Sequence, residues 1–200
     1  MAVSVYIVGM LGHDCLDGTK TVLHELLQQQ NKKCVCLEVP GEAIPADTDV
    51  ALIPITKEQC FLPPVHVPKF DCLMITDRME DHSGKYFCKL MDLVDHAYNR
   101  LKENGIVIYN IDDKEMKKAI SEKGKKSLGF GVSGEAYIAP SSIRDDIDAE
   151  EYMICLTGTF MDHTGEIKGP GEYKVLLREK IEDSNCVLAG TAFMIYFGYI

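Results

Sequence analysis

Polar side chains that suit a metal ion and a nucleotide follow two neighbouring apolar segments of this sequence. Asp81 and His82 come shortly after the apolar segment 70–76, and the run Asn110–Asp113 comes directly after the apolar segment 106–109. Open α/β sheets bind their ligands beyond the carboxyl ends of parallel strands. The order of these segments therefore favours a crevice for a metal ion and a nucleotide. The alternative is a pair of acidic turns in which aspartates cap the following helices.

A glycine-containing segment near the N-terminus is a candidate for phosphate binding. It lies between an apolar segment and an amphipathic helix pattern, where backbone N–H groups at a helix N-terminus can hold phosphates and a lysine can reach the outer ones. The predicted phosphate-binding residues are Gly12, Gly18, Thr19, Lys20 and Thr21. The standard pattern is Gly-x-x-x-x-Gly-Lys-Ser/Thr, whereas here five residues separate the glycines and Thr19 precedes Lys20. The alternative is an ordinary strand-to-helix turn with a solvated Lys20.

The composition argues against several classes of function. The chain has 200 residues, 46% of them apolar, and a formal net charge of −10. This apolar content supports a folded core. The negative charge and the lack of a basic stripe argue against a nucleic-acid partner. The longest apolar run, residues 187–199, is shorter than a membrane span requires, so we expect a buried terminal helix and no membrane association.

The eight cysteines predict neither a disulfide framework nor a zinc site. No Cys-x-x-Cys pair occurs, and Cys34 and Cys36 are spaced so that a strand would place both on one face. The apolar start at residues 3–8 is too short for a signal peptide and lacks a basic flank. We therefore predict reduced thiols and a cytoplasmic location.

Expected strands and expected helices alternate along the chain, which predicts an α/β fold with a mostly parallel sheet. The expected strands are residues 3–8, 33–39, 49–55, 70–76, 106–109 and 127–130. The expected helices are residues 19–30, 85–104 and 114–122. Asp17 or Thr19 is expected to cap the first helix, and Asn104-Gly105 to end the second.

The pattern changes after Gly131. Short apolar segments at 136–139, 152–157 and 173–177 are separated by Gly, Pro and Asp, which predicts a small antiparallel β-layer over residues 131–178. Residues 162–165 have the composition of a hairpin tip. We expect a single domain over residues 1–200.

Several motifs follow one another in an order typical of one enzyme family. Asp81-His82 is followed by Asn110-Ile111-Asp112-Asp113, in the place of Asn-Ala-Asp-Asp, and then by residues 128–131 in the place of Thr-Phe-Gly. Residues 183–190 are similar to an Asn-x-x-Asn-Ala-Leu-Ala-Ala helix. The chain therefore resembles, over nearly its whole length, the central ATP-binding domain of the Mur ligases, which join an amine to a carboxylate through an acyl phosphate.

This resemblance implies a P-loop-type parallel sheet flanked by helices, with ATP and Mg²⁺ as cofactors. The asparagine that matches Asn185 contacts adenine in the family, and Asn110 belongs to a second cofactor-binding motif. The histidine that matches His82 contributes to a magnesium site, where a hard cation also needs carboxylates such as Asp81.

Other parts of the family's machinery are missing from this sequence. Pro54 stands where the family has a magnesium-binding glutamate, and residues 94–97 lack the family's carbamylated lysine. Glu182 replaces the first asparagine of the adenine-contacting motif. Phosphoryl transfer depends on positioning and charge neutralisation, so efficient ligation is not expected. The family's N-terminal and C-terminal domains have no counterpart in the 200 residues.

Two functions from different classes follow. The first is a nucleotide (ATP)-binding domain that is a remnant or subunit of an ATP-dependent carboxylate–amine ligase, weak or inactive alone and with no assigned catalytic residue. The second is a non-catalytic assembly or regulatory protein that keeps the fold without binding nucleotide. The expected partners are a nucleotide and either a second copy or a protein that supplies the missing ligase domains. The apolar C-terminal helix is the expected docking surface.

Overall fold

A computed structural model describes residues 5–12, 15–38, 42–55, 68–76, 85–145 and 150–200 of the chain. Its main feature is a nine-stranded sheet with the strand order β11-β8-β7-β6-β5-β4-β1-β3-β2. Strands β1 to β6 are parallel to one another. They comprise β1 (Tyr6–Leu11), β2 (Cys34–Cys36), β3 (Val50–Pro54), β4 (Phe70–Ile75), β5 (Leu101–Asn110) and β6 (Lys126–Phe130). The predicted mostly parallel α/β sheet is confirmed.

The antiparallel strands extend the same sheet at one edge. Strand β7 (Ile138–Asp145) pairs parallel with β6 at a single position, Phe130 with Ile138. Strands β8 (Glu150–Leu156) and β11 (Gly171–Leu177) then add antiparallel. The predicted hairpin tip lies between β9 (Phe160–Met161) and β10 (Ile167–Lys168), which form a separate two-stranded sheet.

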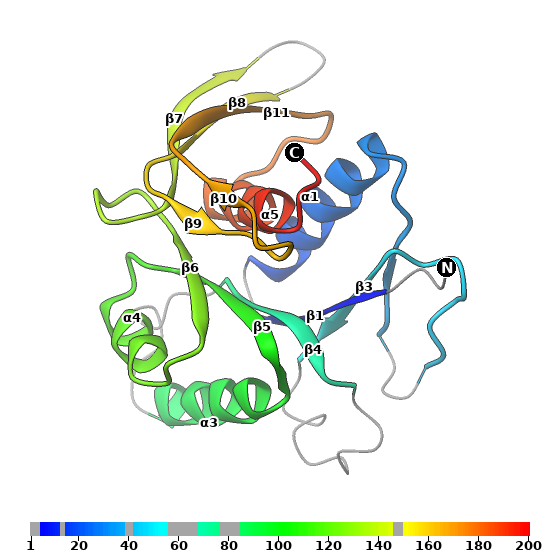
Figure 1. Ribbon diagram of the computed structural model, residues 1–200, viewed down its shortest axis with the longest axis vertical. Coiled ribbons are helices and arrows are strands. Elements are labelled where there is room, and N and C mark those ends of the chain that lie inside the picture. The colour runs from blue at the N-terminus through cyan, green and yellow to red at the C-terminus, as the bar shows by residue number, and fades with distance from the viewer. Residues whose placement is uncertain (1–4, 13–14, 39–41, 56–67, 77–84, 146–149) are drawn as a thin grey trace.

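Helices cover both faces of the parallel strands (Figure 1). Helices α1 (Leu16–Gln29) and α5 (Ser184–Tyr196) pack on one face, and α3 (Lys85–Asn99) and α4 (Lys114–Ser121) pack on the other. Successive residues of a strand point to opposite faces, so neighbours divide between two cores. In β4, Cys72 and Met74 join the core under α1 and α5, while Leu73 and Ile75 join the core under α3 and α4.

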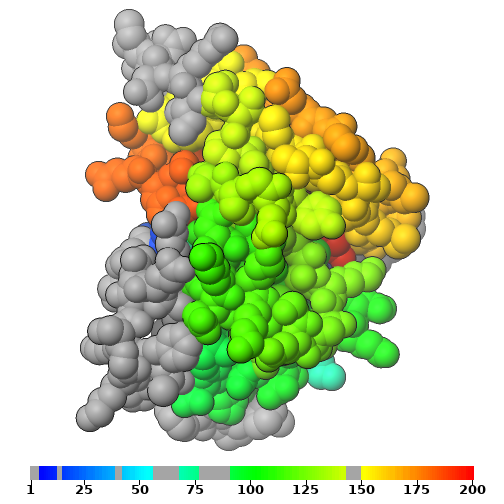
Figure 2. All heavy atoms as spheres, turned by 90° about the vertical axis from the view of Figure 1, so that its left-hand side faces the viewer, coloured from blue at the N-terminus to red at the C-terminus, as the bar shows by residue number. Residues whose placement is uncertain are grey.

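Helix α5 lies inside the molecule. Every residue from Asn185 to Tyr196 is buried, and the helix lies between α1 and the strands β7, β8 and β11 (Figure 1). On the face shown in Figure 2, the red C-terminal end of the chain is visible only as a small patch. The predicted buried terminal helix is confirmed. The hypothesis that this helix offers a docking surface is wrong, because the protein's own elements already cover its apolar side chains.

A predicted helix end is also wrong. Helix α3 ends at Asn99, and Gly105, expected as its cap, lies within β5. Leu101 is buried in the same core as Val94 and Ala97 of α3. The apolar residues therefore keep a helical spacing beyond the end of the helix, as far as the first residue of β5. None of the helices in the described part of the chain has the length and apolarity that a membrane span requires.

Candidate functional site

The strand order places a topological switch point between β1 and β4. After β1 the chain continues to β2, toward one edge of the sheet, whereas after β4 it continues to β5, toward the opposite edge. Leu11 and Ile75, at the carboxyl ends of β1 and β4, are register partners, and the backbone N–H of Thr76 donates to the Leu11 carbonyl at 3.0 Å. Ligands of open α/β sheets bind in such crevices. Gly12 follows Leu11 and therefore lies at this edge.

Helix α1 begins beside the crevice, at Leu16. Its N-cap is Cys15, whose side chain makes no capping hydrogen bond. The prediction that Asp17 or Thr19 caps this helix is therefore wrong. The first-turn N–H groups of a helix have no intrahelical acceptor and carry a partial positive charge, so this end of α1 can receive an anion.

Gly18 and Thr19 lie within α1 and face α5 rather than the crevice. A Cβ at Gly18 would come within 2.8 Å of the Cys186 Sγ, so glycine allows α5 to pack closely against α1. Thr19 is fully buried, and its hydroxyl donates to the Cys15 carbonyl at 2.7 Å. Both residues hold the start of α1 in place.

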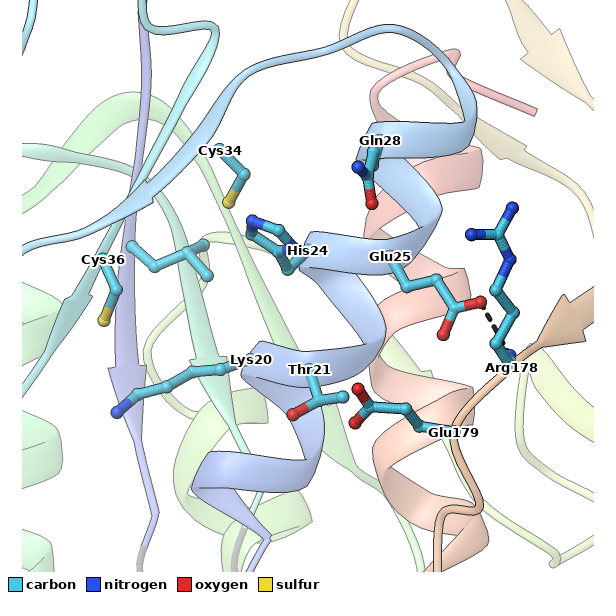
Figure 3. Close-up of a pocket in the computed structure, with 10 residues that line it drawn as sticks. Lys20, Thr21, His24, Glu25, Gln28, Cys34, Cys36, Arg178 and Glu179 are labelled. Carbon is cyan, nitrogen blue, oxygen red and sulfur yellow. Dashed lines mark hydrogen bonds between the residues drawn. The ribbon is translucent and has the colours of Figure 1, made fainter.

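Lys20 and Thr21 line a cavity along the flank of α1 (Figure 3). The Lys20 Nζ lies 3.2 Å from Asp17 Oδ1 and 3.3 Å from Glu38 Oε1, and its side chain extends toward Cys36 of β2. Burial works to lower the pKa of Lys20, but the bonds to Asp17 and Glu38 outweigh burial and raise it. The structure thus divides the five predicted phosphate-binding residues among the crevice, the α1–α5 contact and this flank.

The flank cavity has a volume of about 410 Å³ and opens between α1, β2 and the segment after β11. Its walls carry charges of both signs. The lining residues are Lys20, Thr21, His24, Glu25, Gln28, Cys34, Cys36, Leu52, Arg178 and Glu179. Most of its polar side chains are solvent-exposed, so their positions are weakly constrained.

The two predicted asparagines come together at the carboxyl edge of the sheet. Asn110 is the last residue of β5, and its side-chain amide donates to Asn185 Oδ1 at 3.5 Å. Asn110 is 1% exposed and Asn185 7%. The Asn110 Oδ1 also accepts the backbone N–H of Asp112 at 3.0 Å. This buried contact anchors the N-terminus of α5 beside the crevice.

A second polar contact joins the N-termini of α1 and α5. Asp183 is the N-cap of α5, and its Oδ1 accepts the Asn185 N–H at 2.8 Å. Its Oδ2 accepts the Cys15 thiol at 2.9 Å. We call Cys15, Asn110, Asp183, Asn185 and Cys186 the helix junction. Sequence reasoning missed Cys15 and Asp183 as parts of the site, although an aspartate before the apolar run 184–197 is a recognisable N-cap signal.

The neighbouring carboxylates Asp112 and Asp113 stabilise local structure. The Asp113 side chain caps α4 by accepting the Met116 N–H at 2.9 Å, as the alternative interpretation expected. The Asp112 carboxylate accepts the N–H groups of Val132 and Ser133 at 2.7 and 2.9 Å.

The predicted magnesium ligands Asp81 and His82 lie outside the residues that the structure describes. Within the described ranges, no group of three or more His, Cys, Asp or Glu side chains is arranged to hold a metal ion. Pro54, which stands in the place of a family glutamate, is the buried last residue of β3 and pairs with Met10. The magnesium site therefore remains a prediction.

Comparison with known proteins identifies the fold. No family model and no curated protein sequence matches the chain. Among solved structures, the UDP-N-acetylmuramoylalanyl-D-glutamyl-2,6-diaminopimelate–D-alanyl-D-alanyl ligase of Acinetobacter baumannii matches 97% of this chain with a TM-score of 0.67 at 10% identity. MurF ligase of Thermotoga maritima, in complex with ADP, matches 98% with a TM-score of 0.65 at 14% identity. The chain has a Mur-ligase-like fold.

The match is to part of each ligase. This chain spans 43% of the Acinetobacter baumannii protein and 46% of the Thermotoga maritima protein. An FPGS in complex with AMPPCP also matches 98% of this chain and 61% of its own, with a TM-score of 0.53 at 9% identity. The resemblance to the central domain of the Mur ligases is thus confirmed for the fold.

Proposed function

We propose that this chain binds ATP in the crevice between β1 and β4, as the nucleotide-binding part of an ATP-dependent ligase-like protein. The observation that carries this proposal is the helix junction. It brings the N-termini of two helices and the buried Asn110–Asn185 pair to the carboxyl edge of a parallel sheet. Two neighbours in fold, MurF ligase and FPGS, form complexes with ADP and AMPPCP, which supports a nucleotide as the ligand.

The two helix ends suit different parts of a nucleotide. The N-terminus of α1 has no side-chain cap, so its N–H groups are available to phosphate oxygens, with Gly12 beside them. The N-terminus of α5 is already capped by Asp183, which disfavours a second anion there. We therefore place the phosphates at α1 and the base near Asn185, whose side-chain N–H groups can donate to a heterocycle.

Lys20 has a lesser place in this proposal. In the described arrangement it pairs with Asp17 and Glu38 on the flank of α1, so it would have to leave both carboxylates to reach a phosphate at Gly12. The sequence-based assignment of Gly18, Thr19, Lys20 and Thr21 to phosphate remains a prediction. If Mg²⁺ accompanies the nucleotide, Asp81 and His82 are the residues proposed to hold it.

The ligase part of the proposal concerns a substrate class. Ligases of this kind activate a carboxylate with ATP and transfer it to an amine, and phosphoryl transfer of this sort depends on charge neutralisation. Because Pro54 offers no ligand at the end of β3, we propose that the chain binds nucleotide but ligates weakly or not at all by itself. A second chain would then supply the remaining groups.

One observation favours the alternative function. The lysine and threonine of the phosphate-loop-like segment are engaged within the fold, Lys20 in ion pairs and Thr19 in a buried hydrogen bond. A protein that kept the fold for assembly or regulation, without nucleotide, would have the same arrangement.

Calorimetric titration with Mg-ATP decides between the two functions. We expect saturable binding to the wild-type chain. Asn185→Asp should weaken binding about tenfold or more, because it puts a negative charge beside the ligand. The new carboxylate can still accept the hydrogen bond that Asn110 donates. Asn99→Asp makes the same charge change at an exposed position of α3, on the opposite face of the sheet, and should leave the affinity unchanged. No binding of millimolar nucleotide to the wild-type chain would eliminate the ATP-binding proposal.

A further inference from the structure

Two cysteines that are far apart in the sequence meet at the helix junction. Cys15 precedes α1 and Cys186 lies in the first turn of α5. The Cys186 Sγ lies 3.5 Å from the Cys15 carbonyl oxygen, so the two residues are in direct contact across the ends of α1 and α5. Both are free thiols, 8% and 2% exposed. A disulfide between them requires the two Sγ atoms, which are on neighbouring helix ends, to approach to about 2.05 Å.

The environment makes the two thiols unequal. The neighbouring Cys15 and Thr19 side chains lower the pKa of Cys186 against the effect of burial. The neighbouring Cys186 side chain, burial and the Asp183 carboxylate raise the pKa of Cys15. Cys186 lies in the first turn of α5, where a helix N-terminus favours thiolate formation, and the Cys15 thiol beside it donates its hydrogen to Asp183. Cys186 is therefore assigned as the attacking cysteine and Cys15 as the resolving cysteine.

Three other described cysteines, Cys34, Cys36 and Cys72, lack this arrangement. Burial raises the pKa of Cys34 to about 12 and that of Cys36 to about 11. Cys72 is completely buried, and burial raises its pKa. The junction pair is therefore distinguished by both contact and thiolate character among these thiols.

We infer that Cys15 and Cys186 are a redox-sensitive pair, which a peroxide converts to a disulfide that cross-links α1 to α5 and weakens nucleotide binding in the adjoining crevice. The effect on binding rests on the proposed function, whereas the formation of the disulfide does not.

The chemistry balances with hydrogen peroxide as the oxidant. The Cys186 thiolate attacks one peroxide oxygen, the O–O bond breaks, and the products are a sulfenic acid at Cys186 and hydroxide. The Cys15 thiol then attacks the Cys186 sulfur, the S–O bond breaks, and water leaves with the proton of Cys15. Two thiol sulfurs are oxidised by two electrons and one peroxide is reduced to water.

The cross-link changes the groups that border the crevice. It removes the thiol hydrogen that Cys15 donates to Asp183 Oδ2, so the Asp183 carboxylate loses a partner beside the proposed phosphate site. It also draws the residue that immediately precedes α1 toward α5. A carboxylate with one hydrogen-bond donor fewer and a displaced helix start both oppose the binding of a polyphosphate.

Peptide mapping of the peroxide-treated protein tests the pair directly. Trypsin cleaves after Lys20 and Lys180, and the resulting peptides 1–20 and 181–200 contain Cys15 and Cys186 as their only cysteines. We expect these two peptides to appear joined, lighter by two hydrogens, and to separate again with dithiothreitol. The inference is overturned if Cys36 reacts while Cys15 and Cys186 remain thiols, or if either residue is joined to another cysteine instead.

Mg-ATP titration of the reduced and oxidised forms tests the consequence. We expect on the order of tenfold weaker binding after oxidation, reversed by dithiothreitol. Cys15→Ser keeps a donor for Asp183 and a favourable N-cap residue, and its affinity should not respond to peroxide. Cys36→Ser should respond like the wild type. A cross-linked protein with unchanged affinity would contradict the regulatory part.

The outcomes separate this inference from the proposed function. If the reduced wild-type chain does not bind Mg-ATP, the proposed function fails and the effect on affinity fails with it. The peptide map of the wild-type protein still decides whether the disulfide forms, even if the Cys15→Ser variant does not fold.

Discussion

Helix α1 borders two regions that differ in how their polar groups are held. At its N-terminus, the helix junction consists of buried side chains and the half-buried Asp183, which bond across elements, Asn110 to Asn185 and Cys15 to Asp183. Along its flank, the cavity beside β2 is lined by charged side chains of both signs, and half of its lining residues are exposed. Buried, partnered groups keep one geometry, whereas exposed ion pairs contribute little and rearrange easily. The flank has a cavity of about 410 Å³, but the pre-oriented groups lie at the junction.

The largest expected effect concerns the packing that forms the junction. A Cβ at Gly190 of α5 would come within 2.5 Å of Val22 Cγ1 on α1. Gly190→Ala should therefore lower the free energy of unfolding by about 1–3 kcal/mol, as overpacking of a core does, measured by urea denaturation. Adding Val22→Ala should recover part of this loss, because it removes the methyl groups in conflict.

A matched change on the flank gives the control. His24 is exposed on the cavity side of α1, and His24→Ala should change the free energy of unfolding by less than about 0.5 kcal/mol. Equal losses for Gly190→Ala and His24→Ala would mean that the junction side of α1 is no more closely packed than the flank.

Lys20→Ala tests whether the flank of α1 contributes to stability or to nucleotide binding. Its ion pairs with Asp17 and Glu38 are partly exposed, so their loss should cost less than about 1 kcal/mol in the free energy of unfolding. Because Lys20 extends toward β2, we also expect less than about a threefold change in Mg-ATP affinity. A tenfold or larger loss of affinity would show that Lys20 reaches the phosphates, as the sequence predicts.

The smallest expected effect is a pH dependence on the flank. Hydrogen bonds from the Cys36 thiol and from Lys20 lower the pKa of Glu38 below its ordinary value of 4.5. A carboxylate with a lowered pKa in the folded protein adds stability above its unfolded pKa and loses it as the pH falls through the folded value. The pH-dependent part of the stability difference between wild type and Glu38→Gln should therefore shrink as the pH falls below 4.5 and vanish below the lower pKa that Glu38 has in the folded protein. A difference that persists at lower pH would contradict this assignment.

Local patterns in the sequence predicted the elements of the fold, with errors where long-range packing decides. Short apolar segments located strands such as β3 and β4, and the apolar run before Tyr199 predicted a buried helix. The spacing could not reveal that Leu101 belongs to a strand, because it packs in the same core as α3.

The candidate site was only partly predictable. Sequence motifs singled out Asn110 and Asn185, which meet although 75 positions separate them. The glycine segment was misleading about the start of α1. The helix begins at Leu16, so Thr19 is buried toward α5 whereas Lys20 lies on the flank beside Glu38. The contact between Cys15 and Asp183 depends on how α1 and α5 pack, which no local pattern encodes.

The central claim is that a nucleotide binds at the helix junction and not in the flank cavity. The most direct test is a two-dimensional ¹H–¹⁵N NMR titration with Mg-ATP. We predict saturable shifts of the side-chain amides of Asn110 and Asn185 and of the backbone amides of residues 16–18, with no shift at Asn99. Shifts confined to the cavity residues Lys20, His24 and Cys34, or no shifts at all, would contradict the account.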